Sequence, residues 1–191
     1  DATNETLTIL VADDEQGMRS GVRRALRDLS VEGDGGLTFD LQVEEAADGR
    51  EVLDRLDRGD VDILLLDHGM PEVTGLEVLE ELKRRDAETL TVMITAYATL
   101  DMAVKATKQG AHDFLAKPFT PNELRETVLK AARHLAAARA ARRLANEKRR
   151  VRFEFLSVLA HELKAPLGAV EGYLRLLQEG LINDDPETVA R

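Results

Sequence analysis

Residues 6–14 read TLTILVADD, a short apolar run that ends in two adjacent aspartates. A continuous apolar run of this length is typical of a strand that is buried on both faces of a parallel sheet. The residues that follow place Met18, Val22 and Leu26 at helical spacing. The chain is therefore predicted to begin with a buried strand followed by a helix.

The same alternation of strand and helix continues along the chain. Further strands are predicted at residues 39–46, 63–66, 91–95 and 113–116, of which 63–66 is a continuous apolar run. Helical spacing predicts helices at residues 49–58, 73–85, 100–109 and from Pro121, a residue favoured at helix starts. The Gly- and Asp-rich stretch 30–36 is predicted to be an extended loop. The expected fold class is α/β: a five-stranded, doubly wound parallel sheet, followed by a long coiled-coil-type helix.

Composition and charge restrict the functions that fit the chain. It has 191 residues, a net charge of −10 and no cysteine, so disulfide and thiol chemistry are excluded. No apolar run approaches the roughly 18 residues of a membrane span, and no signal peptide is recognisable, so a cytoplasmic location is expected. Residues 1–120 contain 13 basic and 26 acidic residues, which argues against nucleic acid as a ligand. Residues 121–191 contain 13 basic and 10 acidic residues, and this shift marks a domain boundary.

The last third of the chain is predicted to be one nearly continuous helix over residues 121–179, with Pro166 as its expected bend. Its apolar residues repeat at spacings of three and four, as in coiled coils. One seam contains Val128, Ala131, Leu135 and Ala138, and a second contains Leu156, Leu159, Leu163, Pro166, Val170, Tyr173 and Leu177. If the register is kept, Arg142, Arg149 and Arg152 fall on the seam between them, where pairing is expected to be weak.

Five polar residues stand where the predicted strands end: Asp13, Asp14, Asp67, Thr95 and Lys117. Ligands of open parallel sheets bind at the carboxyl ends of the strands, so these side chains are expected to meet. Clustered carboxylates repel one another unless a cation lies between them, and hard oxygen ligands favour Mg²⁺. With such a metal and a lysine to neutralise charge, the rim is predicted to accept a phosphoryl group on Asp67.

At these positions the sequence resembles the receiver domains of two-component response regulators. The matching residues are VADDE at 11–15, LDHGMP at 66–71, Gly75, ITA at 94–96 and KPF at 117–119. The resemblance covers about residues 6–130. A haloacid-dehalogenase-type hydrolase also uses Asp, Thr and Lys, but its nucleophile lies in an Asp-x-Asp motif after the first strand, unlike the pattern here.

The resemblance implies a set of metal ligands. Asp67 would be the phosphoacceptor, and Asp14 and Asp67 would bind Mg²⁺ directly. Gly69 would offer its backbone carbonyl, while Asp13 would act largely through water. Tyr97 would narrow access to the pocket, which Gly69 leaves open on its side.

The resemblance also implies how the receiver would switch. Thr95 would be the switch hydroxyl and Lys117 the partner of the phosphate. Phe114, three residues before the lysine, matches the aromatic residue that rotates inward on activation.

Residues 155–167 read FLSVLAHELKAPL and resemble the phosphoacceptor box of histidine kinases. His161 is expected to face solvent, because it lies two residues beyond Leu159 of the seam. The resemblance makes His161 the phosphorylated residue and Glu162 the neighbour that takes up or orients its proton. Ala165 stands where many relatives carry Thr or Asn.

Together these observations predict a fragment of a hybrid histidine kinase. Its parts would be a receiver at 1–130, a helical linker at 131–153, and the truncated start of a dimerisation and phosphoacceptor domain at 154–191. Expected partners are a second copy in a parallel homodimer, an upstream phosphodonor kinase or phosphotransfer protein, and the ATP-binding domain of the parent kinase. Without that domain the fragment should not be an active kinase. The alternatives are a stand-alone receiver with a dimerising helical tail and a DNA-binding response regulator.

Overall fold

The computed structural model describes residues 4–32, 38–96 and 99–178. The sheet has six strands in the order β2-β3-β1-β4-β5-β6. The strands are β1 (Asn4–Ala12), β2 (Ser30–Glu32), β3 (Thr38–Ala46), β4 (Ile63–Asp67), β5 (Leu90–Thr95) and β6 (Asp113–Ala116). The helices are α1 (Gln16–Leu26), α2 (Gly49–Leu56), α3 (Gly75–Arg84), α4 (Leu100–Lys108) and α5 (Pro121–Gln178). The predicted α/β fold class is confirmed, with parallel pairing between β3, β1, β4, β5 and β6.

The edge strand β2 was not expected, because its residues were assigned to the loop at 30–36. It pairs antiparallel with β3, and Val31 lies opposite Phe39. Both side chains are 1 % exposed, whereas Ser30 and Glu32 are exposed. A single buried valine is too short a signal for a strand in the sequence, but its burial against Phe39 fixes the segment on the sheet.

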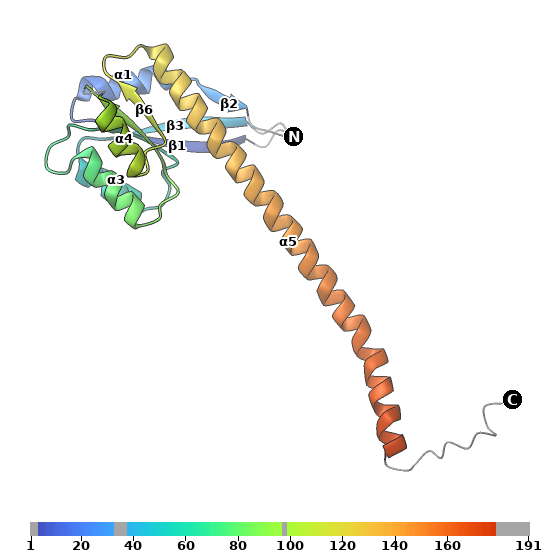
Figure 1. The fold of residues 1–191 in the computed structure, drawn as a ribbon. Helices are drawn as coiled ribbons and strands as arrows, with labels where there is room; N and C mark the ends of the chain where they lie inside the picture. Colours follow the sequence, from blue (N-terminus) through green and yellow to red (C-terminus); the bar gives the residue numbers. More distant parts are fainter. Residues whose placement is uncertain (1–3, 33–37, 97–98, 179–191) are drawn as a thin grey trace. The chain divides into compact units, whose positions relative to one another are not determined.

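Helices cover both faces of the sheet (Figure 1). Along β1, Ile9 and Val11 join the core cluster that contains residues of α1 and α5. Leu10 and Ala12 alternate with them and join the cluster that contains residues of α2, α3 and α4. A strand that is apolar on both sides therefore lies at the centre of a three-layer unit, as predicted for doubly wound sheets.

Capping residues fix the starts of three helices close to the strand ends. Asp48 accepts hydrogen bonds from the backbone N–H groups of Arg50 and Glu51 at the start of α2. Thr74 forms a reciprocal capping box with Glu77 at the start of α3. At the start of α4, the Thr99 hydroxyl accepts a hydrogen bond from the backbone N–H of Met102. Such caps satisfy N–H groups that a helix leaves unpaired, so the strand-to-helix turns are locally determined.

The beginning of α5 belongs to the core of the first unit, which corrects the first predicted coiled-coil seam. Val128 and Ala131 are 0 % exposed and Leu135 packs against the same cluster as β1. Their three- and four-residue spacing is the pattern of any helix face that packs on a sheet. Arg139 adds an ion pair with Asp62, and the first compact unit runs from Asp1 to Ala140.

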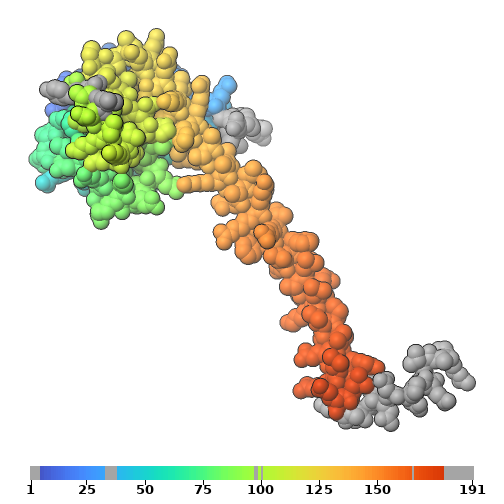
Figure 2. All heavy atoms as spheres, viewed as in Figure 1, coloured from blue at the N-terminus to red at the C-terminus, as the bar shows by residue number. Residues whose placement is uncertain are grey.

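The second unit, Ala141–Arg191, differs in that most of its large apolar side chains up to residue 178 are exposed. Leu156, Leu159 and Leu163 are 51 %, 40 % and 54 % exposed. Pro166 lies inside α5, whose 58 residues agree with the long helix that was predicted. Within this unit the helix has no described neighbour around it (Figure 2). None of the described helices is both long and apolar enough to cross a membrane.

Candidate functional site

Four of the predicted site residues lie at the carboxyl edge of the sheet. Asp13 directly follows β1, Asp67 and Thr95 end β4 and β5, and Lys117 directly follows β6. Asp13, Asp67 and Thr95 are 2 %, 6 % and 1 % exposed, and Lys117 is partly buried. The parallel order of β1, β4, β5 and β6 accounts for this, because it brings residues about 100 positions apart to one edge.

Lys117 joins the two buried carboxylates. Its Nζ lies 2.7 Å from Oδ2 of Asp13 and 2.7 Å from Oδ1 of Asp67. Two carboxylates that were left buried without a cation would repel each other and carry a large desolvation cost. The two carboxylates of Asp13 and Asp67 share the single positive charge of Lys117, so the three groups together keep one net negative charge.

The environment of Lys117 acts on its pKa in two directions. Burial lowers the pKa, but the hydrogen-bonded ion pairs with Asp13 and Asp67 outweigh burial and raise it above the ordinary lysine value. The stabilisation from these ion pairs is therefore present throughout neutral pH and is lost only as the pH rises through that raised pKa.

The backbone after β4 holds the other oxygen of Asp67. The N–H of Gly69 donates to Oδ2 of Asp67 at 2.7 Å. Gly75 lies close behind, and a Cβ at that position would stand 2.3 Å from the backbone oxygen of Asp67. The loop between β4 and α3 can therefore approach the aspartate only because residue 75 has no side chain.

The loop after β1 is held by a residue that the sequence analysis missed. Nη1 of Arg19 donates to the backbone oxygens of Asp13 at 2.7 Å and Asp14 at 3.2 Å. Oδ1 of Asp13 also accepts from the N–H of Glu15 at 2.9 Å. The side chain of Asp14 is exposed at this edge. Arg19 lies one turn into α1 and also pairs with Glu45, so no local pattern in the sequence marked its role.

The oxygen chemistry of the edge suits a hard divalent cation such as Mg²⁺. Asp13, Asp14 and Asp67 offer carboxylates, and two of them carry the negative excess described above. Among residues 4–32, 38–96 and 99–178, no three acidic or histidine side chains already converge as a metal site. The donor types therefore fit the ion, while Lys117 lies between two of the expected ligands.

The remaining receiver residues have more varied surroundings. Phe114 on β6 is partly buried and packs against the cluster beneath α3 and α4. His68, beside Asp67, has a buried Nδ1 with no hydrogen-bond partner within the described part of the chain. The burial of this nitrogen was not predicted, because it depends on the tertiary contacts of His68. Tyr97 lies outside the described residues.

His161 and Glu162 belong to the second unit, on α5. Both side chains are exposed, as predicted for His161. Their surroundings consist of the same helix, so the structure assigns no base, metal or phosphodonor to them.

Comparison with known proteins agrees with the geometry of the edge. Residues 9–129 match the family described as response regulator receiver domain. Chemotaxis protein CheY of Listeria monocytogenes is 34 % identical over 127 residues, which are 66 % of this chain and 99 % of that protein. Response regulator protein PilR of Pseudomonas aeruginosa is 34 % identical over 65 % of this chain and 26 % of its own length.

Among solved structures, chemotaxis protein CheY4 of Vibrio cholerae superimposes with a TM-score of 0.56 at 28 % identity. The superposition covers 66 % of this chain and 98 % of that one. The chain therefore belongs to the response regulator receiver domain family of two-component signalling, in which an aspartate accepts the phosphoryl group.

Proposed function

We propose that Asp67 is the phosphoacceptor of this receiver. The observation that carries the proposal is the position of Lys117, whose ammonium group lies 2.7 Å from carboxylate oxygens of both Asp67 and Asp13. In the transfer, a carboxylate oxygen of Asp67 forms a bond to phosphorus as the bond between phosphorus and the donor atom breaks, which is an oxygen in acetyl phosphate and an imidazole nitrogen in a phosphohistidine. The donor leaves with the bonding electron pair, so the reaction needs no oxidant or reductant.

The other edge residues stabilise the added charge. Lys117 already faces Asp67 and supplies a cation for the phosphoryl oxygens, while the Thr95 hydroxyl donates a hydrogen bond to one of them. Asp13, Asp14, Asp67 and the backbone carbonyl of Gly69 would hold Mg²⁺. The bound ion would supply further positive charge at the phosphoryl group.

The switch would pass through Thr95 and Phe114. Movement of the Thr95 hydroxyl toward the phosphoryl group vacates space beside β5, and Phe114, on the neighbouring strand, turns into it. The partial burial of Phe114 supports such a movement. This would alter the surface formed by α4, β6 and the start of α5.

The second unit adds a kinase hypothesis. We propose that His161 is the phosphoacceptor of a histidine kinase, with Glu162 assisting its proton, and that α5 pairs in parallel with a second copy. The 13-residue string at 155–167 and the exposed Leu156, Leu159 and Leu163 support this. The protein would act in the cytoplasm and receive phosphoryl groups from an upstream kinase or phosphotransfer protein. An ATP-binding domain would phosphorylate His161, and ATP alone should label neither His161 nor Asp67.

Acetyl phosphate labelling tests the proposal. Wild type with Mg²⁺ should gain one acid-stable, base-labile phosphoryl group, and removal of Mg²⁺ by EDTA should suppress the gain. Asp67→Asn should abolish labelling, because an amide is not a nucleophile for phosphorus, while His161→Gln should label like wild type. Undiminished labelling of Asp67→Asn would overturn the assignment.

A further inference from the structure

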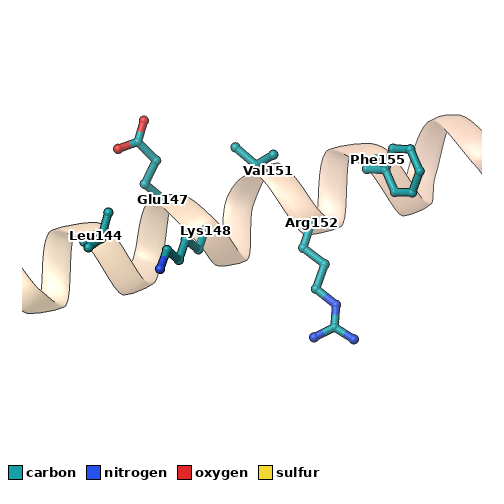
Figure 3. Close-up of a pocket in the computed structure, with 6 residues that line it drawn as sticks. All are labelled: Leu144, Glu147, Lys148, Val151, Arg152 and Phe155. Atoms are coloured by element: carbon teal, nitrogen blue, oxygen red, sulfur yellow. The ribbon is translucent and has the colours of Figure 1, made fainter.

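A shallow apolar groove runs along one face of α5 in the second unit. Its lining residues are Leu144, Glu147, Lys148, Val151, Arg152 and Phe155. Leu144 and Val151 are each 55 % exposed and Phe155 is 61 % exposed. Figure 3 shows the Glu147 carboxylate and the Arg152 guanidinium pointing to opposite sides of this face. An apolar strip with one acidic and one basic edge is the result.

The six residues have the spacing of a two-stranded coiled coil. Leu144, Lys148, Val151 and Phe155 follow one another at intervals of four, three and four residues, which is the spacing of the d, a, d and a positions. Glu147 then falls at a g position and Arg152 at the following e position. These are the two positions whose side chains meet across the interface of paired helices.

We infer that this strip binds the same strip of a second copy of the chain, in parallel and in register, with Glu147 of each helix paired to Arg152 of the other. The inference rests on the proposed parallel dimer and specifies its register. In a parallel pair, a g residue faces the e residue five positions later on the other helix. Glu147 and Arg152 are five positions apart, so each dimer gains two ion pairs.

The charges select the parallel arrangement. In an antiparallel pair, g residues face g residues and e residues face e residues, so Glu147 could not pair with Arg152 of the other helix in any register. Lys148 at an a position also limits the assembly to a pair, because its ammonium can reach solvent at the edge of a two-stranded interface. A buried lysine in a larger bundle would be far more costly.

In this coiled-coil register, Arg142 and Arg149 no longer lie on the seam, where they were expected. Arg142 and Arg149 become b positions, and Arg149 lies over the Phe153 ring at 5.7 Å. Arg150 pairs with Glu154 of its own helix at 3.8 Å. Within the basic stretch, only Lys148 then faces its own copy across the pair, and its flexible stem can carry the ammonium to solvent.

The strip continues into the seam beside His161 through a change in spacing. Val151, Phe155, Leu159 and Leu163 follow one another at three successive intervals of four. An interval of four in place of the expected three adds one residue to the heptad pattern, and this locally unwinds a left-handed supercoil. The unwound segment therefore ends at the turn that carries His161.

Sedimentation of the full chain tests the inference through a charge exchange. Glu147→Arg and Arg152→Glu alone should each weaken the dimer by on the order of tenfold, since each creates two like-charge contacts per dimer. Glu147→Arg combined with Arg152→Glu should restore the wild-type dissociation constant. Arg149→Glu makes the same charge change off the interface and should have little effect.

Disulfide trapping gives an independent reading, because the chain has no cysteine. In parallel register, Leu144→Cys and Val151→Cys should each cross-link efficiently to themselves, and Arg150→Cys should not. Two results would overturn this register but leave the proposed dimer standing. One is a dimer whose dissociation constant the double charge exchange does not restore, and the other is cross-linking at Arg150→Cys alone. A monomeric wild type would overturn both, while acetyl phosphate labelling of Asp67 would stand apart from either result.

Discussion

Leucines have opposite surroundings in the two units of the molecule. Leu65 on β4 is 0 % exposed, and Leu163 on α5 is 54 % exposed. Around Leu65, strands and helices bury one another and hold Asp13, Asp67 and Lys117 at a shared edge. Around Leu163 the described structure contains only its own helix. The first unit therefore gathers its candidate site within one chain, whereas the second has an exposed apolar face that the proposed dimer would cover.

The largest expected effect comes from truncating one leucine in each unit. Leu65→Ala should lower the free energy of unfolding of the first unit by about 2–5 kcal/mol, because a cavity remains in a packed core. Leu163→Ala should leave that free energy unchanged within about 0.5 kcal/mol. Urea denaturation of both variants measures the difference, and equal losses would remove the distinction between the units.

A matched pair of glycines sharpens the comparison within the first unit. Gly75→Ala should cost about 1–3 kcal/mol, because its Cβ would meet the backbone oxygen of Asp67 at 2.3 Å. Gly21→Ala has nothing within 4 Å and lies inside α1, so it should stabilise by about 0.5–1 kcal/mol. Thermal denaturation should move in opposite directions for the two. A stable Gly75→Ala variant with full acetyl phosphate labelling would contradict the close approach of this loop.

A charge on the exposed seam should affect the second unit alone. Leu159→Glu should weaken self-association at least about tenfold, since an unpaired carboxylate would be buried between two helices. Labelling of Asp67 should remain at the wild-type level. Sedimentation and labelling of one preparation test both statements, and a dimer indifferent to Leu159→Glu would exclude this seam.

The smallest effect should come from the outer face of α5. Arg150 and Glu154 are 71 % and 68 % exposed and 3.8 Å apart. Arg150→Ala should change stability and self-association by no more than about 0.5 kcal/mol, because solvent screens exposed pairs. An effect above 1 kcal/mol would mean that this face also contacts a partner.

The sequence predicted what depends on local periodicity and strand order. Buried runs such as 63–66 identified the central strands, and the parallel order placed Asp13, Asp67 and Lys117 at one edge. Pro121 marked the start of α5, where Thr120 and Glu123 form a capping box.

What the sequence could not predict depends on contacts between distant residues. Val31 forms a strand only because Phe39 lies opposite, and Val128 has the same spacing in a coiled coil as on a sheet. The hydrogen bonds of Arg19 to the loop after β1 also arise from the tertiary fold. These features share a cause, which is that the residues they depend on are brought together only by the tertiary fold.

The central claim is that Asp67 of this receiver forms the phosphoryl bond. Borohydride reduction of protein treated with acetyl phosphate and Mg²⁺ converts an acyl phosphate into a stable alcohol, which peptide mass spectrometry can locate. The account predicts modification at Asp67 alone, and none when Lys117→Ala removes the cation that faces it. Modification at Asp13 or Asp14, or unchanged modification of Asp67 in Lys117→Ala, would contradict it.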